Sequence, residues 1–505
     1  MPTLGKILQH RAYFTPKKEA IVGMKRRFTY EQYNKRVNQF AHYLLSLDVK
    51  PGDRIALLCS TDYWNPMLIF AIAKVGAIVI PLNWRLNANE LAPLMENAQP
   101  KILFYDEEFS NILTYAKDIS HIERAIKVGV DGDLDPALEE LIDSFPDQEP
   151  NIEVDQHAPV ILAYTSGTTG TPKGVLGSHD QYYNSCVSAL FAGGFGSDGR
   201  SLFFSPLFHV SALCLLLQAA LTGQTIVFMP RFHPRQVWDI VEQERVTFVY
   251  GAPALLKMML PFLLERDRDL GSLQMIGSGG TFLPKDLALS YISFGYPVMN
   301  IYGQSEFMGA ISYWSPDMGL DKIDSIGKLI NGEMKIVDAD TKQELPPGEV
   351  GEIAVKSPSV FIGYWQNDEE TLKVKDEDGW LYTGDAGYID QDGFIYVVDR
   401  YKDMIRFAVE TVFPSEVEEV IRGLDGVNDV ALIGVPHKDF GEIPRAYIEL
   451  KEGATITEQE VLAYCHEKMA AFKVREVIFI EKLPRNGVGK IQKQLLRDQA
   501  ASKTK

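Results

Sequence analysis

The chain has 505 residues, 46 % hydrophobic and 23 % charged, which is an ordinary globular composition but a length beyond what one hydrophobic core usually serves. Its formal net charge of −18 argues against binding to DNA or RNA, because nucleic-acid binding normally begins with a basic surface. The start of the chain mixes Lys, His, Arg and Pro, and its most apolar stretches fall short of the roughly 20 residues that span a bilayer. We therefore expect a cytoplasmic protein of at least two domains, with no nucleic-acid partner and no integral membrane contact.

The cysteines and histidines show no spacing typical of a metal site or a redox pair. No two of the nine histidines are at metal-ligand spacing, and the four cysteines lie far apart. These cysteines are Cys59, Cys186, Cys214 and Cys465. We predict that they are reduced core residues, and that any required cation arrives with the substrate.

Apolar strand-like runs alternate with helical patterns up to about residue 400. Residues 54–59 form one such run before a helix, and residues 225–229 form another before a helix at 236–244. This alternation predicts stacked parallel α/β layers. From about Gly327 the pattern changes to short strands separated by Gly and Asp turns, which indicates a small antiparallel sheet or barrel-like subdomain.

The pattern changes again after residues 399–403. A capped helical pattern begins at Pro414, and an apolar strand follows at 430–435. We predict a mixed α/β protein with a large N-terminal domain over 1–400 and a small α+β C-terminal domain over 401–505.

The strongest chemical signal is an apolar strand at 160–165 that runs into a loop of hydroxyls, glycines and one lysine. Backbone N–H groups of glycines, hydroxyl donors and a lysine charge together suit a polyphosphate. The loop is not a Walker A motif, because Thr171 and Pro172 separate Gly170 from Lys173. Its candidate phosphate-binding residues are Thr165, Ser166, Gly167, Thr168, Thr169, Gly170 and Lys173.

The string from Tyr164 to Gly174 resembles the signature loop of the adenylate-forming superfamily of acyl-CoA synthetases, luciferases and peptide-synthetase adenylation domains. Five further segments resemble the family's motifs in the family's order, over essentially the whole chain. The resemblance implies an AMP-forming acid–thiol ligase with ATP, Mg²⁺ and coenzyme A as cofactors and a small carboxylic acid as substrate. It also implies that the C-terminal domain is mobile, with a hinge near Lys402.

Residues 300–306 resemble the family's Tyr-Gly-x-Thr-Glu strand end, with Ser305 in place of the threonine. An aromatic face can stack on adenine, a hydroxyl can donate to the α-phosphate, and the carboxylate of Glu306 can hold Mg²⁺. Residues 278–280 resemble the loop along which adenine lies. The resemblance thus adds to the ATP site Ser278, Gly279, Gly280, Tyr302, Gly303, Gln304 and Ser305.

Three further polar residues resemble family positions in the last quarter of the chain. Asp385 matches the aspartate that accepts hydrogen bonds from the two ribose hydroxyls, and a two-oxygen acceptor suits a vicinal diol. Arg400 matches the arginine that contacts ribose or phosphate. Lys490, after a glycine-flanked loop, matches the catalytic lysine. The predicted catalytic residues are Lys490, His209 and Glu306, with Glu306 as the metal ligand.

Residues 205–209 resemble the segment whose aromatic residue and histidine border the acyl pocket. The predicted pocket residues are Phe208, His209, Ser211, Tyr250, Gly251, Ala252, Met308 and Gly309. They are largely apolar, which favours a monocarboxylate with a hydrophobic tail or ring, fatty or aryl. Amino-acid-activating relatives carry an aspartate after the aromatic residue, where this chain has His209.

The chain departs from the family pattern in the loop after the hinge, the predicted coenzyme A tunnel loop of Phe407, Ala408 and Val409. Acyl-CoA synthetases usually carry two glycines where Ala408 and Val409 stand, and a β-branched residue resists the positive φ that glycine allows. This leaves open an alternative acceptor, a carrier protein or another nucleophile. A homodimer is possible. An inactive nucleotide sensor is disfavoured, because Lys490, Glu306, Lys173 and Asp385 are all present.

Overall fold

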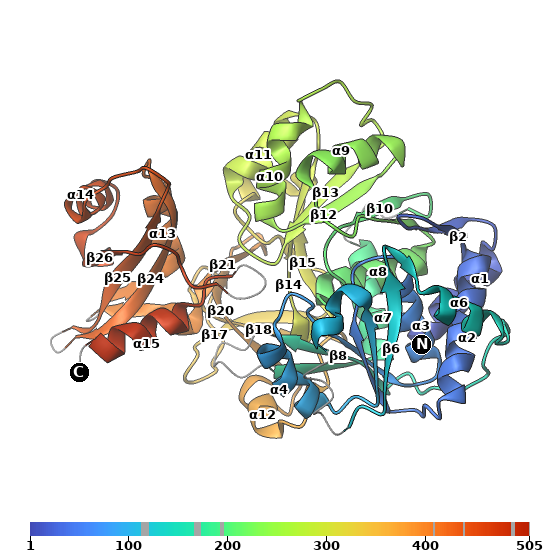
Figure 1. Cartoon of the computed structure of the whole chain (residues 1–505). Helices are drawn as coiled ribbons and strands as arrows, with labels where there is room; N and C mark the ends of the chain where they lie inside the picture. Colours follow the sequence, from blue (N-terminus) through green and yellow to red (C-terminus); the bar gives the residue numbers. More distant parts are fainter. Residues whose placement is uncertain are drawn as a thin grey trace. The chain divides into compact units, whose positions relative to one another are not determined.

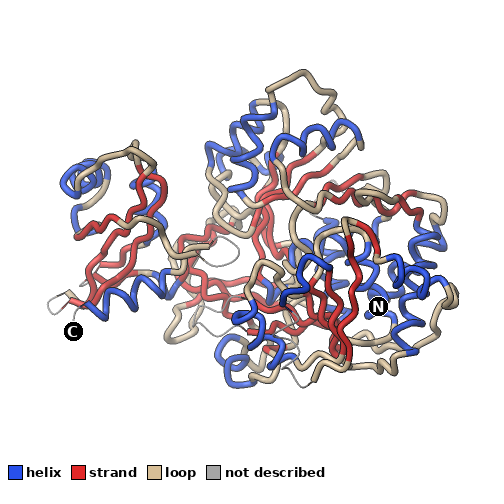
Figure 2. Tube along the Cα trace, in the orientation of Figure 1, coloured by secondary structure: helices blue, strands red, loops and turns tan. Residues whose placement is uncertain are grey.

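The computed structural model describes residues 1–112, 121–165, 173–191, 196–407, 410–437, 440–485 and 490–503. The described residues divide into two compact units (Figures 1 and 2). The first unit comprises 1–165, 173–333 and 356–381, and the second comprises 334–355 and the described residues from 382 onward. The predicted domain boundary at 400/401 falls inside the second unit and stays a prediction.

The first unit contains an eight-stranded sheet in the order β19-β9-β8-β4-β3-β5-β6-β7. Its central strands are parallel, and β9 runs antiparallel to both β8 and β19. The strands are β3 (Arg54–Leu58), β4 (Ile78–Pro81), β5 (Ile102–Asp106), β6 (Arg124–Val130), β7 (Asp133–Leu134), β8 (Pro159–Thr165), β9 (Lys173–Ser178) and β19 (Gly363–Tyr364). Strand β4 is buried along its whole length, as expected for a central parallel strand covered on both faces.

The same unit contains a nine-stranded sheet in the order β16-β15-β14-β13-β12-β10-β11-β1-β2, parallel from β14 through β1. The strands are β1 (Glu19–Val22), β2 (Arg27–Thr29), β10 (Arg200–Phe203), β11 (Thr225–Phe228), β12 (Phe248–Gly251), β13 (Met275–Gly279), β14 (Val298–Gln304), β15 (Gly309–Trp314) and β16 (Lys328–Leu329). The prediction of parallel α/β layers is confirmed, including the runs that became β3 and β11.

The helices of the first unit alternate with its strands along the chain, beginning with α1, which precedes β1 (Figure 1). They are α1 (Leu4–Phe14), α2 (Tyr30–Ser46), α3 (Trp64–Lys74), α4 (Ala88–Ala98), α6 (Pro136–Asp143), α7 (His179–Phe191), α8 (Val210–Thr222), α9 (Pro234–Gln243), α10 (Pro253–Leu263), α11 (Lys285–Ser293) and α12 (Asp368–Val374). Every residue of α3 is buried, because this helix lies inside the unit, whereas α2 begins with a Thr29–Gln32 capping box at its exposed end. Short 3-10 turns include η1 (Glu107–Ile112), η2 (Ser305–Phe307), η3 (Pro316–Met318) and η4 (Leu320–Lys322).

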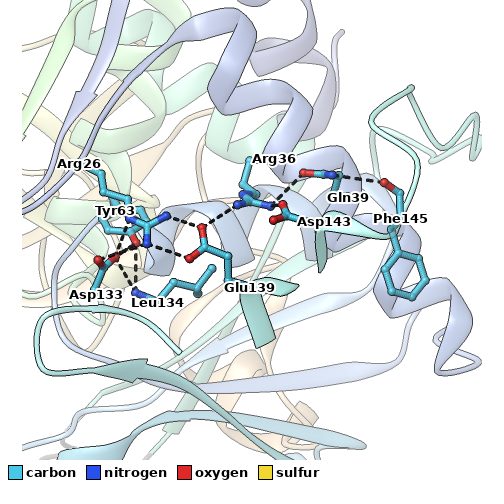
Figure 3. Close-up of polar contacts among 9 residues, drawn as sticks. All are labelled: Arg26, Arg36, Gln39, Tyr63, Asp133, Leu134, Glu139, Asp143 and Phe145. Atoms are coloured by element: carbon cyan, nitrogen blue, oxygen red, sulfur yellow. Dashed lines mark hydrogen bonds and ion pairs between the residues drawn. The ribbon is translucent and has the colours of Figure 1, made fainter. Parts of the chain in front are cut away.

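A chain of polar contacts joins the start of the first unit to α6 (Figure 3). Arg26 pairs with Asp133 at 2.8 Å and also with Glu139, and Arg36 pairs with Glu139 at 2.9 Å. The hydroxyl of Tyr63 donates to Asp133. None of these residues is a predicted site residue, so the network is best explained as structural.

The second unit begins with a four-stranded sheet, the predicted small antiparallel region, in the order β17-β18-β20-β21. Its strands are β17 (Glu333–Val337), β18 (Gly351–Lys356), β20 (Leu381–Ile389) and β21 (Ile395–Arg400). Strands β20 and β21 are antiparallel, with Asp385 opposite Arg400. This pairing brings together two predicted site residues that stand 15 positions apart.

The rest of the second unit is the predicted α+β region. A five-stranded sheet carries a hydrophobic cluster on each face. Its elements are η5 (Tyr401–Asp403), β22 (Ile405–Phe407), β23 (Glu410–Val412), α13 (Pro414–Arg422), β24 (Val427–His437), β25 (Gly441–Leu450), α14 (Glu458–Lys468), η6 (Ala471–Lys473), β26 (Glu476–Phe479) and α15 (Lys493–Lys503). Pro414 occupies the first position of α13, where a missing N–H costs nothing, as the sequence predicted.

All four cysteines are buried and free, which confirms the prediction that they are reduced core residues. Among the helices in the described part of the chain, none combines the length and the apolar character that a bilayer crossing requires.

Candidate active site

Lys173 is the first residue of β9 and lies opposite Thr165, the last residue of β8. The Thr165 hydroxyl donates to the Lys173 carbonyl at 3.5 Å. The antiparallel pair thus holds the two ends of the predicted phosphate loop together. The loop residues Ser166, Gly167, Thr168, Thr169 and Gly170 lie outside the described residues.

Glu306 and Lys173 are both in contact with Tyr364. The Tyr364 hydroxyl donates to Glu306 Oε1 at 2.8 Å, and the Lys173 ammonium lies 4.9 Å from the centre of the Tyr364 ring. Lys173 Nζ also lies 2.5 Å from Glu370 Oε2. The first unit therefore gathers one predicted metal ligand and one predicted phosphate lysine around a tyrosine and a second carboxylate.

Sequence reasoning missed Tyr364 and Glu370. Tyr364 is in the two-residue strand β19, which pairs with β9 so that Tyr364 is opposite Val175. Nothing in the local sequence marks so short a strand, and only its pairing with a segment nearly 200 residues earlier brings Tyr364 to Lys173.

The residues around Glu306 fit a magnesium ion that arrives with a nucleotide. Among the described residues, no cluster of three or more His, Cys, Asp or Glu side chains could cage a metal. Glu306 Oε1 accepts the hydrogen bond from the Tyr364 hydroxyl, whereas Glu306 Oε2 accepts none in the described part of the chain. One free carboxylate oxygen suits Mg²⁺, which is usually bound through one or two carboxylates, with substrate phosphates and water completing its shell.

The two predicted adenine segments are neighbouring strand ends. In the parallel pair of β13 and β14, Ser278 is opposite Asn300 and Gly279 is opposite Ile301. A Cβ at Gly279 would lie 2.5 Å from the Ile301 carbonyl oxygen, so the close approach requires glycine. Gly280 follows at a φ of +85°, a conformation that also favours glycine.

The remaining residues of this motif lie at the end of β14 and in η2. These are Tyr302, Gly303, Gln304 and Ser305. A Cβ at Gly303 would lie 2.0 Å from the Gly309 carbonyl oxygen, which explains glycine there. The segments 278–280 and 302–305 therefore lie at the carboxyl ends of two neighbouring parallel strands of the nine-stranded sheet. Ligand sites usually lie at this end of parallel strands.

Phe208 and His209 directly precede α8, and their ring centres are 4.6 Å apart. Trp84 meets Phe208 edge-on at 6.1 Å between ring centres. Burial, together with the nearby Arg85 guanidinium, lowers the pKa of His209 to about 4. His209 is therefore neutral near pH 7 and can act there as a hydrogen-bonding group but not as a cation.

The other residues predicted to line the acyl pocket are Ser211, Tyr250, Gly251, Ala252, Met308 and Gly309. Tyr250 is buried close to Ser211, and a Cβ at Gly309 would meet Cys214 Sγ at 2.8 Å. Gly251 ends β12 and Ala252 caps α10. Met308 is fully buried, and its sulfur lies against Gly177. These are apolar, closely packed surroundings.

In the second unit, Arg400 Nε lies 2.7 Å from Asp385 Oδ1. The Asp385 backbone amide donates to the Thr383 hydroxyl oxygen at 3.1 Å, and the Arg400 guanidinium donates to the Thr383 carbonyl at 3.4 Å. Gly384 has a φ of +69° and donates to Glu352 at 3.0 Å. Asp385 is 96 % buried, so its orientation is well defined by β20, β21 and this arginine.

Lys490 lies near both residues within the second unit. Desolvation lowers the pKa of the Lys490 ammonium, the Arg400 charge lowers it further, and Asp385 and Asp403 oppose the shift. The residue as a whole is exposed, so the desolvation concerns its charged end. Asp403 also accepts a hydrogen bond from Arg497 at 2.7 Å. A lysine held among these charges is sensitive to any further negative charge brought beside it.

The predicted hinge and tunnel residues lie close together in the sequence of the second unit. Lys402 is in η5, and the Phe407 ring stacks on Phe440 with centres 4.8 Å apart. Ala408 and Val409 lie outside the described residues, so their effect on the acceptor stays a prediction.

A surface pocket of about 350 Å³ lies elsewhere in the first unit and contains none of the predicted site residues. It is lined by Arg27, Phe28, Gln32, Lys35, Arg36, Gln39, Asp143 and Asp147. Its arginines are paired with carboxylates, including Arg27 with Glu19 at 3.2 Å. The pocket therefore gives no competing candidate for the site.

Two family models match the chain. The AMP-binding enzyme model matches residues 8–365, and the AMP-binding enzyme C-terminal domain model matches residues 416–490. The matched ranges include every predicted ATP-site residue except Asp385 and Arg400.

Several relatives match over nearly their whole length. A putative acyl-CoA ligase, YdaB, of Bacillus subtilis (strain 168) is 36 % identical, with 99 % of each chain covered. A feruloyl-CoA synthase of an Amycolatopsis species is 34 % identical over 98 % of each chain. The long-chain-fatty-acid–CoA ligase FadD13 of Mycobacterium tuberculosis is 32 % identical over 99 % of each chain.

Solved structures agree with these matches. ATP-bound MatB from Rhodopseudomonas palustris superposes with a TM-score of 0.90 at 28 % identity, with 98 % of each chain covered. The o-succinylbenzoate coenzyme A synthetase MenE of Bacillus subtilis, solved with ATP and a magnesium ion, gives 0.87 at 30 % identity, covering 98 % of this chain and 99 % of MenE. The predicted mixed α/β fold and the predicted class, an AMP-forming acid–thiol ligase of the adenylate-forming superfamily, are confirmed at the level of the family. The chain belongs to the AMP-binding enzyme family.

Proposed function

We propose that this chain activates a hydrophobic monocarboxylic acid, fatty or aryl, as its acyl-adenylate and then transfers the acyl group to coenzyme A. The observation that carries the proposal is the gathering of Glu306, Lys173 and Tyr364 in the first unit, at hydrogen-bonding and ring-contact distances. A carboxylate and an ammonium group held this way suit the phosphates of a magnesium nucleotide.

The chemistry needs charge neutralisation more than it needs a nucleophile from the protein. A carboxylate oxygen of the acid attacks the α-phosphorus of ATP, a new O–P bond forms, and the bond to the pyrophosphate oxygen breaks. Magnesium supplies positive charge to the phosphate oxygens when it is bound. Lys173 and Lys490 would add their charges to phosphate and carboxylate oxygens, which lowers the barrier between two anions.

The proposal also covers binding of the ATP ribose and the transfer of the acyl group to coenzyme A. Asp385 would accept hydrogen bonds from the ribose hydroxyls, with its orientation set by Arg400 at 2.7 Å. The thiolate of coenzyme A then attacks the acyl carbonyl, the thioester forms and AMP leaves. Relatives named as CoA ligases support coenzyme A as the acceptor despite Ala408 and Val409.

The preference for an apolar acid rests on the residues near Phe208. Trp84, Phe208 and Tyr250 are aromatic, Phe208 and Tyr250 are buried, and His209 is neutral near pH 7. Such surroundings stabilise an alkyl chain or a ring and give little to a charged tail. The relatives named above include a feruloyl-CoA synthase and a long-chain-fatty-acid–CoA ligase, so aryl and fatty acids both belong in the test.

The proposal is tested by measuring pyrophosphate release with Mg-ATP across a panel of saturated fatty acids and substituted benzoic and cinnamic acids, with and without coenzyme A. Products are identified by mass spectrometry. We expect acid-dependent turnover that requires coenzyme A and yields an acyl-CoA and AMP. A single equivalent of pyrophosphate that coenzyme A does not accelerate would reject coenzyme A as acceptor, and no acid-dependent release would reject the substrate class.

A further inference from the structure

We propose that Glu370 is a positioning residue that holds the ammonium group of Lys173 in the nucleotide-free protein and competes for it with the triphosphate of ATP. This inference rests on the proposed function, which assigns Lys173 to the phosphates. Lys173 Nζ and Glu370 Oε2 are 2.5 Å apart, and the two side chains are only 18 % and 28 % exposed. The pair is therefore a direct and partly shielded contact.

The local fold holds Glu370 in place. The Asn367 side chain caps α12 by accepting from the Glu370 amide at 3.1 Å. One residue later, the Thr371 hydroxyl oxygen accepts from the Tyr364 amide at 2.9 Å. Because Tyr364 is in β19 and β19 pairs with β9, the strand that begins at Lys173, the two charged side chains are positioned by one continuous piece of structure.

Glu370 stays ionised at any physiological pH. Its pKa is lowered to about 2, by Lys173 first and then by Lys373. Lys373 Nζ lies 2.7 Å from Glu370 Oε1, on the other oxygen of the same carboxylate. When Lys173 moves to a phosphate, Glu370 keeps Lys373 as a partner. The exchange therefore leaves no unpaired carboxylate, and its cost is limited to one ion pair.

An ion pair that must break on binding weakens the apparent affinity for the ligand that breaks it. ATP carries β- and γ-phosphates and competes for Lys173, whereas AMP carries neither of these groups. Removing the charge of Glu370 should therefore tighten ATP binding and leave AMP binding unchanged. A general loss of fold or of the nucleotide site would instead weaken both ligands.

The test is isothermal titration calorimetry on the full chain with two probes, the magnesium complex of α,β-methylene-ATP and AMP. Glu370→Gln should tighten binding of the ATP analogue by about two- to fivefold, the range of one partly exposed ion pair, with AMP unchanged. Glu370→Asp should restore the weaker affinity. The matched control is Glu369→Gln, since Glu369 pairs with Lys373 at 2.7 Å but, in the described part of the chain, forms no ion pair with Lys173.

Kinetics give a second readout that a merely structural role would not produce. In Glu370→Gln the KM for ATP should fall and inhibition by pyrophosphate should strengthen, while kcat for adenylate formation does not rise. Unchanged or weaker binding of the ATP analogue, or equal tightening of AMP, would overturn the inference. A wild-type chain that binds neither nucleotide would instead overturn the proposed function, so the two failures are distinguishable.

Discussion

Lys173 in the first unit and Lys490 in the second are both assigned to oxyanions of the reaction, yet their surroundings differ. Lys173 is held by a carboxylate at 2.5 Å and lies over an aromatic ring. Lys490 is desolvated and repelled by Arg400, with Asp385 and Asp403 in partial compensation. The first arrangement holds the ammonium group in one position, while the second lowers the pKa of the lysine and leaves its charge with only partial compensation. We therefore expect Lys173 to govern nucleotide affinity and Lys490 to govern rate.

The largest expected effect comes from Lys490→Ala. Removing a charge that stabilises the transition state should slow adenylate formation by about 100- to 1,000-fold. ATP–pyrophosphate exchange measures this step, and thioester formation from a pre-made acyl-adenylate should be much less affected. The control is Lys482→Ala, an exposed lysine in the same region. Equal losses in both half-reactions would contradict the role assigned to Lys490.

Glu306→Gln should reduce pyrophosphate exchange by about 10- to 100-fold and raise the magnesium concentration needed for half-maximal rate. A neutral amide binds Mg²⁺ less tightly than a carboxylate. The measurement is a magnesium titration of the exchange reaction, with the exposed Glu349→Gln as control. A lower rate without any change in magnesium requirement would remove Glu306 from the metal site.

Asp385→Asn should weaken ATP binding by about tenfold, because hydrogen bonds to a charged acceptor are stronger than those to a neutral one. Comparing ATP with 2′,3′-dideoxy-ATP isolates the ribose contribution. The wild type should discriminate strongly between the two nucleotides and the variant weakly. Unaltered discrimination would mean that Asp385 serves only to hold Arg400.

Tyr364→Phe keeps the ring over Lys173 and removes the hydroxyl that donates to Glu306 at 2.8 Å. We expect a loss of about two- to tenfold in pyrophosphate exchange, with a raised magnesium requirement, since one neutral hydrogen bond is removed. The same variant should bind AMP normally. If the magnesium requirement stays at the wild-type value, Tyr364 does not orient Glu306.

The smallest expected effect is on the pH profile of adenylate formation. Lys490 acts as a cation, so the rate should fall as the pH rises through its lowered pKa. Arg400→Gln removes a charge that lowers this pKa and should move the alkaline limb to higher pH, whereas Asp385→Asn should move it to lower pH. Shifts in the same direction for both variants would show that another group controls the limb.

The sequence predicted the layers of the fold well where a local pattern was strong. Residues 54–59 and 225–229 became β3 and β11, and Pro414 starts α13, because apolar runs and capping residues act over a few positions. The division of the chain into two compact units was harder to predict from the sequence. The second compact unit takes in residues 334–355, which precede a return to the first unit at 356–381, and such a crossing depends on long-range packing.

The candidate site shows the same limit. Glu306, Lys173, Asp385 and Lys490 were identified from motifs, since each motif is a short local string. Tyr364 and Glu370 were not, because their relevance arises from the pairing of a two-residue strand with β9. The lowered pKa of Lys490 likewise depends first on desolvation of its ammonium group and then on the charge of Arg400, and only the folded unit creates these surroundings.

The most direct test of the central claim, acyl-adenylate formation, is to follow oxygen-18 from a labelled carboxylic acid. The acid is supplied with both carboxylate oxygens labelled, together with Mg-ATP and coenzyme A, and the products are analysed by mass spectrometry. If the carboxylate attacks the α-phosphorus, one labelled oxygen must leave with AMP and the other must remain in the thioester carbonyl. AMP without the label, or label in inorganic phosphate or pyrophosphate, would contradict the account.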